Sequence, residues 1–454
     1  MTTVHAAPQV TRWLAARAAS LSYEDLSDAA VTVARQCILD WFAVTLPGAA
    51  EPAVRILCDE LLADGAAPVA SLVGMPRGSS AMNAALINGT ASHALDFDDV
   101  NMAILGHPTV ALLPGLLALA EDIDAPPRDV LTAFVAGYDV VCRTGALMSP
   151  GHYEHGFHAT ATVGSIGAAA ACARLLGLDA ETSATAYGIA ATMASGLKSM
   201  FGTMCKPLHA GRAAQNGLQA ARLAARGFTS RPDALECAQG MAAAQSANFN
   251  PEDAMMDAPF DHHIRNNLFK YHASCYLTHG AIEAARLIRE RHAISSNAVQ
   301  GVTIRVPPVT DRVCNIAKPA TGLEAKFSLR LTAAMALAGR DTSGIDTFDD
   351  AATDVPELVR LRDIARIEFD ESYPEAKALV TVDTANGERF TAAYDAGVPD
   401  ADLDRQGRKL ARKFEALVGP VLGRRATELR SALVEFGEGG TVAEIMSLAR
   451  GANE

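Results

Sequence analysis

The chain has 454 residues, of which 49% are hydrophobic and 20% are charged, and its formal net charge is −13. This composition is typical of a globular protein with more than one hydrophobic core, and the acidic balance disfavours a nucleic-acid partner because no basic stripe can neutralise phosphates. No uninterrupted apolar run is long enough to span a bilayer, and the N-terminus lacks a secretory signal, so we expect a cytoplasmic protein without a membrane partner.

The eight cysteines are scattered along the chain, and none forms a C-x-x-C pair. This pattern disfavours a zinc knuckle, an iron–sulfur cluster and a thioredoxin-like motif. Reduced thiols, as in a cytoplasm, are the simplest interpretation.

The first part of the chain, from residue 8 to about 265, is predicted to be almost wholly helical. A long amphipathic run covers 26–46, with Ser22 as its expected N-cap. Further helices are expected over 78–95, 108–122, 127–148, 158–176, 180–197 and 209–226. Many of them carry Ala and Gly at helical spacing, which permits close helix contacts and predicts burial on several sides.

The pattern changes after about residue 295, where period-two alternation predicts strands over 302–306, 366–370, 379–383 and 389–394. Asn386-Gly387 predicts a hairpin turn between the last two strands. One helix over 322–338 and a surface loop over 341–356 interrupt the strands, and helices over 403–417, 424–436 and 441–450 follow. We therefore predict a mainly α protein, with a large all-helical domain formed by both chain ends (1–268 and 403–454) and a smaller α+β domain (269–402).

The segment 93–108 contains His93, Asp96, Asp98, Asp99 and His107. Such a group can bind a divalent cation, position a base, or be the solvated end of a helix. Aspartate-rich motifs in helical proteins also hold magnesium for diphosphate chemistry, but the second metal motif of those enzymes is not visible here.

The segment 151–164 carries His152, His155 and His158, whose spacing fits no common zinc signature. His158 opens a helix of small residues, and a helix N-terminus favours an anion and keeps a nearby imidazole neutral. His152 and His155 are expected to be exposed loop residues. The other histidines without supporting context are expected at the surface: His5, His262, His263 and His292.

Lys206 lies among small and apolar residues, and His209 and Arg212 follow it closely. A lysine in such surroundings loses hydration, so it needs an anionic partner or a lowered pKa. The segment therefore indicates a binding site for a carboxylate, or else a lysine whose ammonium extends to water.

Lys270, Cys275 and His279 form the last candidate group. Cys275 lies where a helix is expected to begin, which makes a thiol more acidic, although a small buried hydrophobic residue is an equal interpretation. His279 follows one turn later and could face the same way.

Together these segments resemble the MmgE/PrpD family, which includes 2-methylcitrate dehydratase, cis-aconitate decarboxylase and iminodisuccinate epimerase. The resemblance covers nearly the whole chain, and its carriers lie at 96–99 with 106–108, 156–158, 202–209, 270–279 and 325–329. It implies a homodimer, catalysis without metal or organic cofactor, and a small di- or tricarboxylate substrate held between two domains. The positions that match the family's site are Asp96, His107, His158, Lys206 and Lys270.

The chain departs from the family's decarboxylases at three places. They carry histidine where Cys275 stands, threonine where Val100 stands, and a tyrosine in the stretch that here spans 311–316. These differences disfavour decarboxylation. The spacing from Asp96 to His107, and the segment 274–276, look more like the epimerase and the bacterial members.

The chemistry shared by the family is removal of a proton next to a carboxylate. We expect His158 to act as the base and His107 as the acid, with Asp96 orienting an imidazole. The groups expected to bind substrate are Lys206, Lys270, His209, Arg212, Cys275 and His279. A dehydratase-like lyase is the first expectation, an epimerase the second and a decarboxylase the third; a non-enzymatic binding protein is the alternative from another class.

Overall fold

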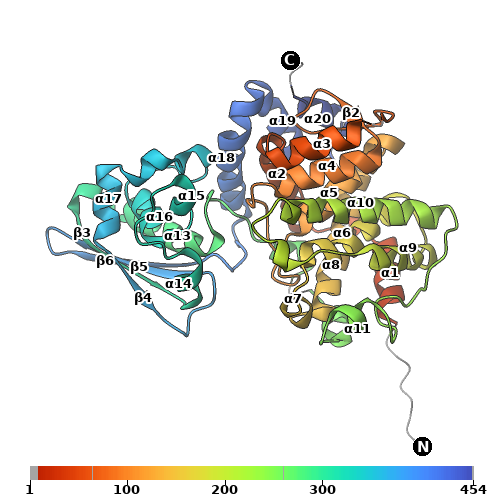
Figure 1. Cartoon of the computed structure of the whole chain (residues 1–454), viewed down its shortest axis with the longest axis horizontal. Coiled ribbons are helices and arrows are strands. Elements are labelled where there is room, and N and C mark those ends of the chain that lie inside the picture. Colours follow the sequence, from red (N-terminus) through yellow and green to blue (C-terminus); the bar gives the residue numbers. More distant parts are fainter. Residues whose placement is uncertain (1–8, 64, 259, 452–454) are drawn as a thin grey trace, which may run out of the picture. The chain divides into compact units, whose positions relative to one another are not determined.

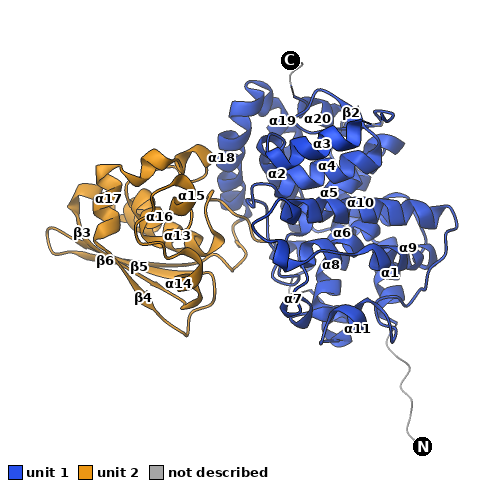
Figure 2. Ribbon diagram, viewed as in Figure 1, with its two compact units in different colours: residues 1–267, 403–454 blue, residues 268–402 orange. Residues whose placement is uncertain are grey.

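The computed structural model describes residues 9–63, 65–258 and 260–451. The chain divides into two compact units, coloured separately in Figure 2: unit 1 comprises Met1–Asn267 and Leu403–Glu454, and unit 2 comprises Leu268–Asp402. Helices dominate the described residues, so the prediction of a mainly α protein is confirmed.

Unit 1 is built from helices of both chain ends (Figure 1). Its N-terminal helices are α1 (Val10–Ser20), α2 (Asp28–Gly48), α3 (Pro52–Leu62), α4 (Ala81–His93), α5 (Pro108–Ile123), α6 (Pro127–Met148), α7 (Gly151–Glu154), α8 (Ala159–Leu175), α9 (Ala180–Met193), α10 (Cys205–Ala225), α11 (Met241–Gln245) and α12 (Pro251–Met255). Its C-terminal helices are α18 (Leu403–Leu422), α19 (Arg425–Val434) and α20 (Val442–Leu448). Unit 1 is not entirely helical, because β1 (Ala70–Ser71) and β2 (Gly78–Ser79) pair in antiparallel fashion.

Small residues bring the central helices of unit 1 close together. Helices α4, α5 and α8 all contact α10, and α8 is buried from Ala159 to Ala173. A Cβ atom on Gly89 of α4 would lie only 2.6 Å from the Cα of Gly211 on α10. The expectation of close packing through small side chains is therefore confirmed.

Several local boundaries differ from the prediction. Ser22 caps a 3-10 turn at Tyr23–Asp25, whereas Ser27 is the N-cap of α2 and accepts from the backbone N–H of Ala30. Helix α10 begins at Cys205, four residues earlier than expected, because Pro207 fits the first turn of a helix. The stretch 227–267 is much less helical than predicted, and the helices among its described residues are short.

Two helices, α2 and α6, are long and apolar enough to cross a membrane by length and composition. Their most apolar windows are 83% and 94% buried inside the protein, respectively. Packing against protein therefore accounts for their apolar character.

Unit 2 contains a four-stranded sheet in the order β4-β3-β5-β6. The strands are β3 (Val299–Val306), β4 (Ala365–Phe369), β5 (Lys377–Thr384) and β6 (Arg389–Asp395); β3 and β4 are parallel and the other pairs antiparallel. The predicted hairpin is confirmed, and Gly387 has the positive φ of 85° that its turn requires.

The helices of unit 2 are α13 (His279–His292), α14 (Val309–Cys314), α15 (Gly322–Ala325), α16 (Leu329–Leu337) and α17 (Pro356–Asp363). Figure 1 shows α13, α16 and α17 on one side of the sheet, and alternate residues of β5 are buried beneath them. The single helix predicted over 322–338 is broken in two, because Ser328 is the N-cap of α16. The loop predicted at the surface over 341–356 contains 3-10 turns and the buried Thr342.

Candidate active site

The beginnings of three contacting helices of unit 1 meet at one place. His107 is the N-cap of α5, His158 is the N-cap of α8, and Lys206 and His209 lie on the first turns of α10. The backbone N–H of His107 donates to Thr160 Oγ1 at 3.1 Å, which joins the starts of α5 and α8. Because a helix N-terminus carries a partial positive charge, three such ends make this region favourable for an anion.

The acidic loop between α4 and α5 forms one wall of this region. Asp96 has a left-handed backbone with φ of 50°, a conformation that aspartate tolerates better than most residues. The backbone N–H of Asn101 donates to the Gly106 carbonyl at 2.9 Å and closes the loop. Asp98 and Asp99 are buried, whereas the side chain of Asp96 is 55% exposed.

Lys206 has an anionic partner, as its apolar surroundings require. Its Nζ lies 2.8 Å from Asp96 Oδ2, and its side chain is only 17% exposed. The ammonium also lies 5.5 Å from the centre of the Phe201 ring. Lys206 is therefore a part-buried cation at the helix ends and does not extend into water.

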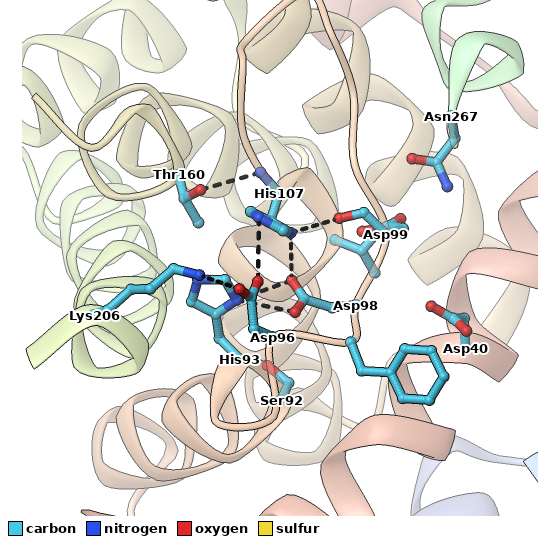
Figure 3. Close-up of polar contacts among 12 residues, drawn as sticks. Asp40, Ser92, His93, Asp96, Asp98, Asp99, His107, Thr160, Lys206 and Asn267 are labelled. Carbon is cyan, nitrogen blue, oxygen red and sulfur yellow. Dashed lines mark hydrogen bonds and ion pairs between the residues drawn. The ribbon is translucent and has the colours of Figure 1, made fainter. Parts of the chain in front are cut away.

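Asp98 lies between two imidazoles (Figure 3). Nδ1 of His93 is 3.0 Å from each carboxylate oxygen, and Nδ1 of His107 is 2.9 Å from Oδ2. Burial alone would raise the pKa of Asp98, but the charge and hydrogen bonds of the two imidazoles hold it well below its ordinary value. Asp96 is 3.8 Å from His107 Nε2, too far for a hydrogen bond, so the carboxylate that orients this ring is Asp98 and not the expected Asp96.

His158 is surrounded by other rings. Its Nδ1 is 3.1 Å from Nδ1 of His209, and Phe201 packs edge-on against it with 4.9 Å between ring centres. Burial lowers the pKa of His158, and the groups that lower it further are His93, His107, Lys206 and His209. The imidazole is therefore neutral at working pH and can accept a proton.

Buried polar side chains hold the acidic loop between α4 and α5 in place. Lys413 of α18 lies 2.6 Å from Asp40 of α2, and it donates to the backbone carbonyl of Phe97 at 2.6 Å. Asp99 accepts from Thr109 Oγ1. Burial raises the pKa of Asp99 to about 7, and the negative charges of Asp40 and Asp98 add to the rise.

One set of possible metal donors lies here: among the described residues, donor atoms of His93, Asp96, Asp98 and His107 lie within 4.8 Å of one another. Several donor atoms of these residues already have other partners. Both Nδ1 atoms bond to Asp98, and the ammonium of Lys206 neutralises Asp96. A divalent cation would compete with Lys206 for Asp96 and with the two imidazoles for Asp98, which disfavours a metal at this site.

The structure brings together five of the expected site residues: Asp96, His107, His158, Lys206 and His209. Arg212 is not among them, because it is exposed and donates to Gln215. His93 and Asp98 were in the noted segment but were not predicted as site residues. Their only sequence signal was their closeness to the other two aspartates.

Two histidines expected at the surface are buried. His152 donates from Nδ1 to the Gln245 carbonyl at 3.1 Å and bonds through Nε2 to Thr162 Oγ1 at 2.6 Å. His262 is only 7% exposed. His263 is partly buried, whereas His155 and His292 are exposed as predicted; His5 lies outside the described residues.

The remaining expected residues belong to unit 2. Lys270 and His279 are buried, and His279 Nε2 donates to the Ser274 carbonyl at 3.3 Å. Burial lowers the pKa of His279, and the nearby charges of His272 and Lys270 lower it further. Cys275 is part-buried and packs against the core of this unit, as the interpretation as a small hydrophobic residue predicts.

His272 of unit 2 was not predicted. Its Nε2 is 3.2 Å from Glu283 and its Nδ1 is 2.7 Å from Thr342 Oγ1. Thr342 lies about 70 positions further along the chain, and no local pattern links the two.

Comparison with known proteins identifies the family of the chain. The family model of the MmgE/PrpD N-terminal domain matches residues 12–254, and that of the C-terminal domain matches 272–435. The chain is 28% identical over 382 residues to the cis-aconitate decarboxylase of Mus musculus, covering 78% of this chain and 75% of the relative. It is 30% identical over 329 residues to that of Homo sapiens, covering 69% and 67%. It is 25% identical over 491 residues to the cis-aconitate decarboxylase-like protein oryM of Aspergillus oryzae, covering 99% and 100%. The chain therefore belongs to the MmgE/PrpD family.

Proposed function

We propose that this protein is a cofactor-independent lyase that removes a proton next to a carboxylate of a small di- or tricarboxylate. The observation that carries the proposal is the neutral His158 beside Lys206, at the meeting point of three helix N-termini. A base and a fixed cation in one region are what this proton transfer needs when no metal takes part.

The substrate carboxylate binds at Lys206 and the helix ends, where it competes with Asp96 for the ammonium. His158 then takes the proton from the neighbouring carbon, and the electrons of the broken C–H bond form a carbon–carbon double bond. His107 gives a proton to the departing hydroxyl, which leaves as water. Lys270 of unit 2 is the cation assigned to a second carboxylate, on the basis of the family resemblance.

Decarboxylation is the second candidate, because the relatives described above are named cis-aconitate decarboxylases or decarboxylase-like. In that reaction CO₂ departs and leaves the electrons of the broken C–C bond on the substrate as a carbanion. One of the same imidazoles would then protonate this carbanion. The differences at Val100, at Cys275 and in the tyrosine-free stretch 311–316 favour dehydration over this reaction.

The test is a panel of four compounds incubated in D₂O and followed by proton NMR: 2-methylcitrate, citrate, cis-aconitate and iminodisuccinate. Formation of an alkene from a hydroxy acid supports the proposal. Loss of CO₂ from cis-aconitate would contradict the proposed dehydration and identify a decarboxylase. Deuterium uptake with inversion but no alkene would contradict it and identify an epimerase. The matched control is His158→Ala, whose rate on whichever compound reacts should be lower on the order of 10²-fold or more.

A further inference from the structure

We propose that Asp98 is a positioning residue that holds both His93 and His107 as the tautomer protonated at Nδ1. His107 is thereby forced to exchange its catalytic proton at Nε2 alone. The kinetic consequence rests on the proposed function, but the assignment of the tautomers does not.

The first step concerns His107. Its Nδ1 lies 2.8 Å from the backbone carbonyl of Asp99 and 2.9 Å from Asp98 Oδ2. A carbonyl and a carboxylate only accept hydrogen bonds, so Nδ1 must carry the hydrogen in this geometry. In the neutral ring the lone pair is then on Nε2, which is 3.8 Å from Asp96 Oδ1 and so lies on the side of the Asp96–Lys206 pair.

The second step concerns His93, the last residue of α4. Its Nδ1 faces both oxygens of Asp98 at 3.0 Å and must donate to them, while its Nε2 has no hydrogen-bond partner among the described residues. Burial lowers the pKa of His93 to about 4, so the ring is neutral and Nε2 is unprotonated. His93 is only 1% exposed, so it supports Asp98 and does not itself reach a substrate.

The third step is the charge that Asp98 supplies. The carboxylate is buried, and its two imidazole donors come from α4 and from the start of α5. When Nε2 of His107 is protonated, the imidazolium has the anion of Asp98 at its other nitrogen, where the same hydrogen bond persists. Asp98 thus keeps the ring orientation constant while the proton at Nε2 comes and goes.

The decisive variant is Asp98→Asn, which keeps the size of the side chain. An amide accepts through its oxygen but donates through its nitrogen, so it can no longer accept from two rings with both of its polar atoms. His107 keeps the Asp99 carbonyl as an acceptor, so His93, whose Nδ1 faces the two polar atoms of residue 98, is the ring expected to give up its hydrogen at Nδ1. Nitrogen NMR of histidine-labelled protein without substrate reads the tautomers, and His93→Gln and His107→Gln assign the signals.

We expect protonated Nδ1 signals for both rings in the native protein, and loss of at least one of them in Asp98→Asn. We also expect kcat on the reacting compound to fall on the order of 10²-fold or more while KM changes little, because proton transfer and not binding is affected. The exposed Asp59→Asn is the matched control and should change neither the spectrum nor the rate.

An unprotonated Nδ1 on His107 in the native spectrum would overturn the proposal, and this reading does not depend on whether Asp98→Asn folds. Unchanged tautomers together with an unchanged kcat in a folded Asp98→Asn protein would overturn it as well. If no compound reacts but both Nδ1 atoms are protonated, the tautomer assignment stands and the proposed function fails.

Discussion

At the scale of single residues, the candidate site depends on a histidine that is neutral because it is buried among other rings. His158 loses hydration, and its neighbours His93, His107 and Lys206 further disfavour a positive charge on it. A neutral imidazole is available as a base without first releasing a proton.

We predict that His158→Ala lowers kcat on the order of 10²–10⁴-fold, the usual contribution of acid–base catalysis. Steady-state rates on the compound identified by NMR check this. His155 lies three residues earlier and is exposed, so His155→Ala is the matched control and should retain full activity. A rate near that of the native protein in His158→Ala would remove this residue from the mechanism.

Lys206 should act in binding more than in proton transfer. We predict that Lys206→Ala lowers kcat/KM by about 10- to 100-fold, mainly through KM, because a hydrogen bond to a charged group contributes about 1.5–3 kcal/mol. Lys198→Ala is the matched control: its Nζ donates to the Tyr153 carbonyl at 3.0 Å and lies over the Tyr153 ring. An unchanged kcat/KM in Lys206→Ala contradicts the carboxylate role.

At the scale of helices, the site depends on how closely α4 and α10 approach. A Cβ atom on Gly211 would lie 2.2 Å from the backbone oxygen of Leu86, which cannot move aside as a flexible side chain could. This contact positions the start of α10, which carries Lys206, against the end of α4, which carries His93.

We predict that Gly211→Ala destabilises the protein by about 1–3 kcal/mol through overpacking, measured by urea denaturation. Gly419→Ala in α18 is the matched control, because nothing lies within 4 Å of a Cβ atom at that position. It should be neutral or stabilise the protein by about 0.5–1 kcal/mol through helix propensity. Equal effects of the two substitutions would contradict the packing argument.

Helix periodicity predicted most of the elements, because spacing is a local property. The bounds of α6 matched, α5 differed by one residue at its end, and α8 differed by one residue at each end. The N-caps were harder to predict. Ser22 and Ser27 are both residues that favour an N-cap, but Ser22 precedes a 3-10 turn and Ser27 precedes α2. The local sequence does not distinguish these two outcomes. Non-local contacts had no signal, as the bond between His272 and Thr342 shows.

The site could be predicted in part for the same reason. Lys206 stood out because an isolated charge among apolar residues needs a partner, but nothing in the sequence identified that partner as Asp96. Choosing Asp98 over Asp96 as the partner of His107 required the left-handed turn at Asp96. The spacing of Asp96 and Asp98 in the sequence does not reveal such a turn. Assembly as a homodimer stays a prediction, which light scattering can check.

At the scale of the whole molecule, several buried imidazoles make stability depend on pH. Burial lowers the pKa of each of three histidines of unit 1 to about 4: His93, His152 and His263. In the unfolded chain these rings take up protons below about pH 6.5, whereas in the folded protein they do so only near pH 4. The unfolded state therefore binds more protons within this window, and the free energy of unfolding falls as the pH falls.

Asp99 has the opposite sign. Burial raises its pKa to about 7, so within the same window the folded protein keeps a proton that the unfolded chain has lost. Each such group changes the free energy of unfolding by at most about 1.4 kcal/mol per pH unit. The three histidines outweigh the single aspartate, so we predict that these groups together lower stability between neutral pH and about pH 5.

Urea denaturation of two variants at several pH values separates the contributions. His152→Asn lies outside the candidate site, and its amide can still donate to the Gln245 carbonyl that Nδ1 of His152 contacts. It should make the pH dependence of the free energy of unfolding shallower by up to about 1.4 kcal/mol per pH unit, because one histidine whose pKa differs between the folded and unfolded states is removed. Asp99→Asn should make it steeper by a similar amount, because the opposing group is gone. If both variants kept the native slope, these buried groups would not control the acid sensitivity of the fold.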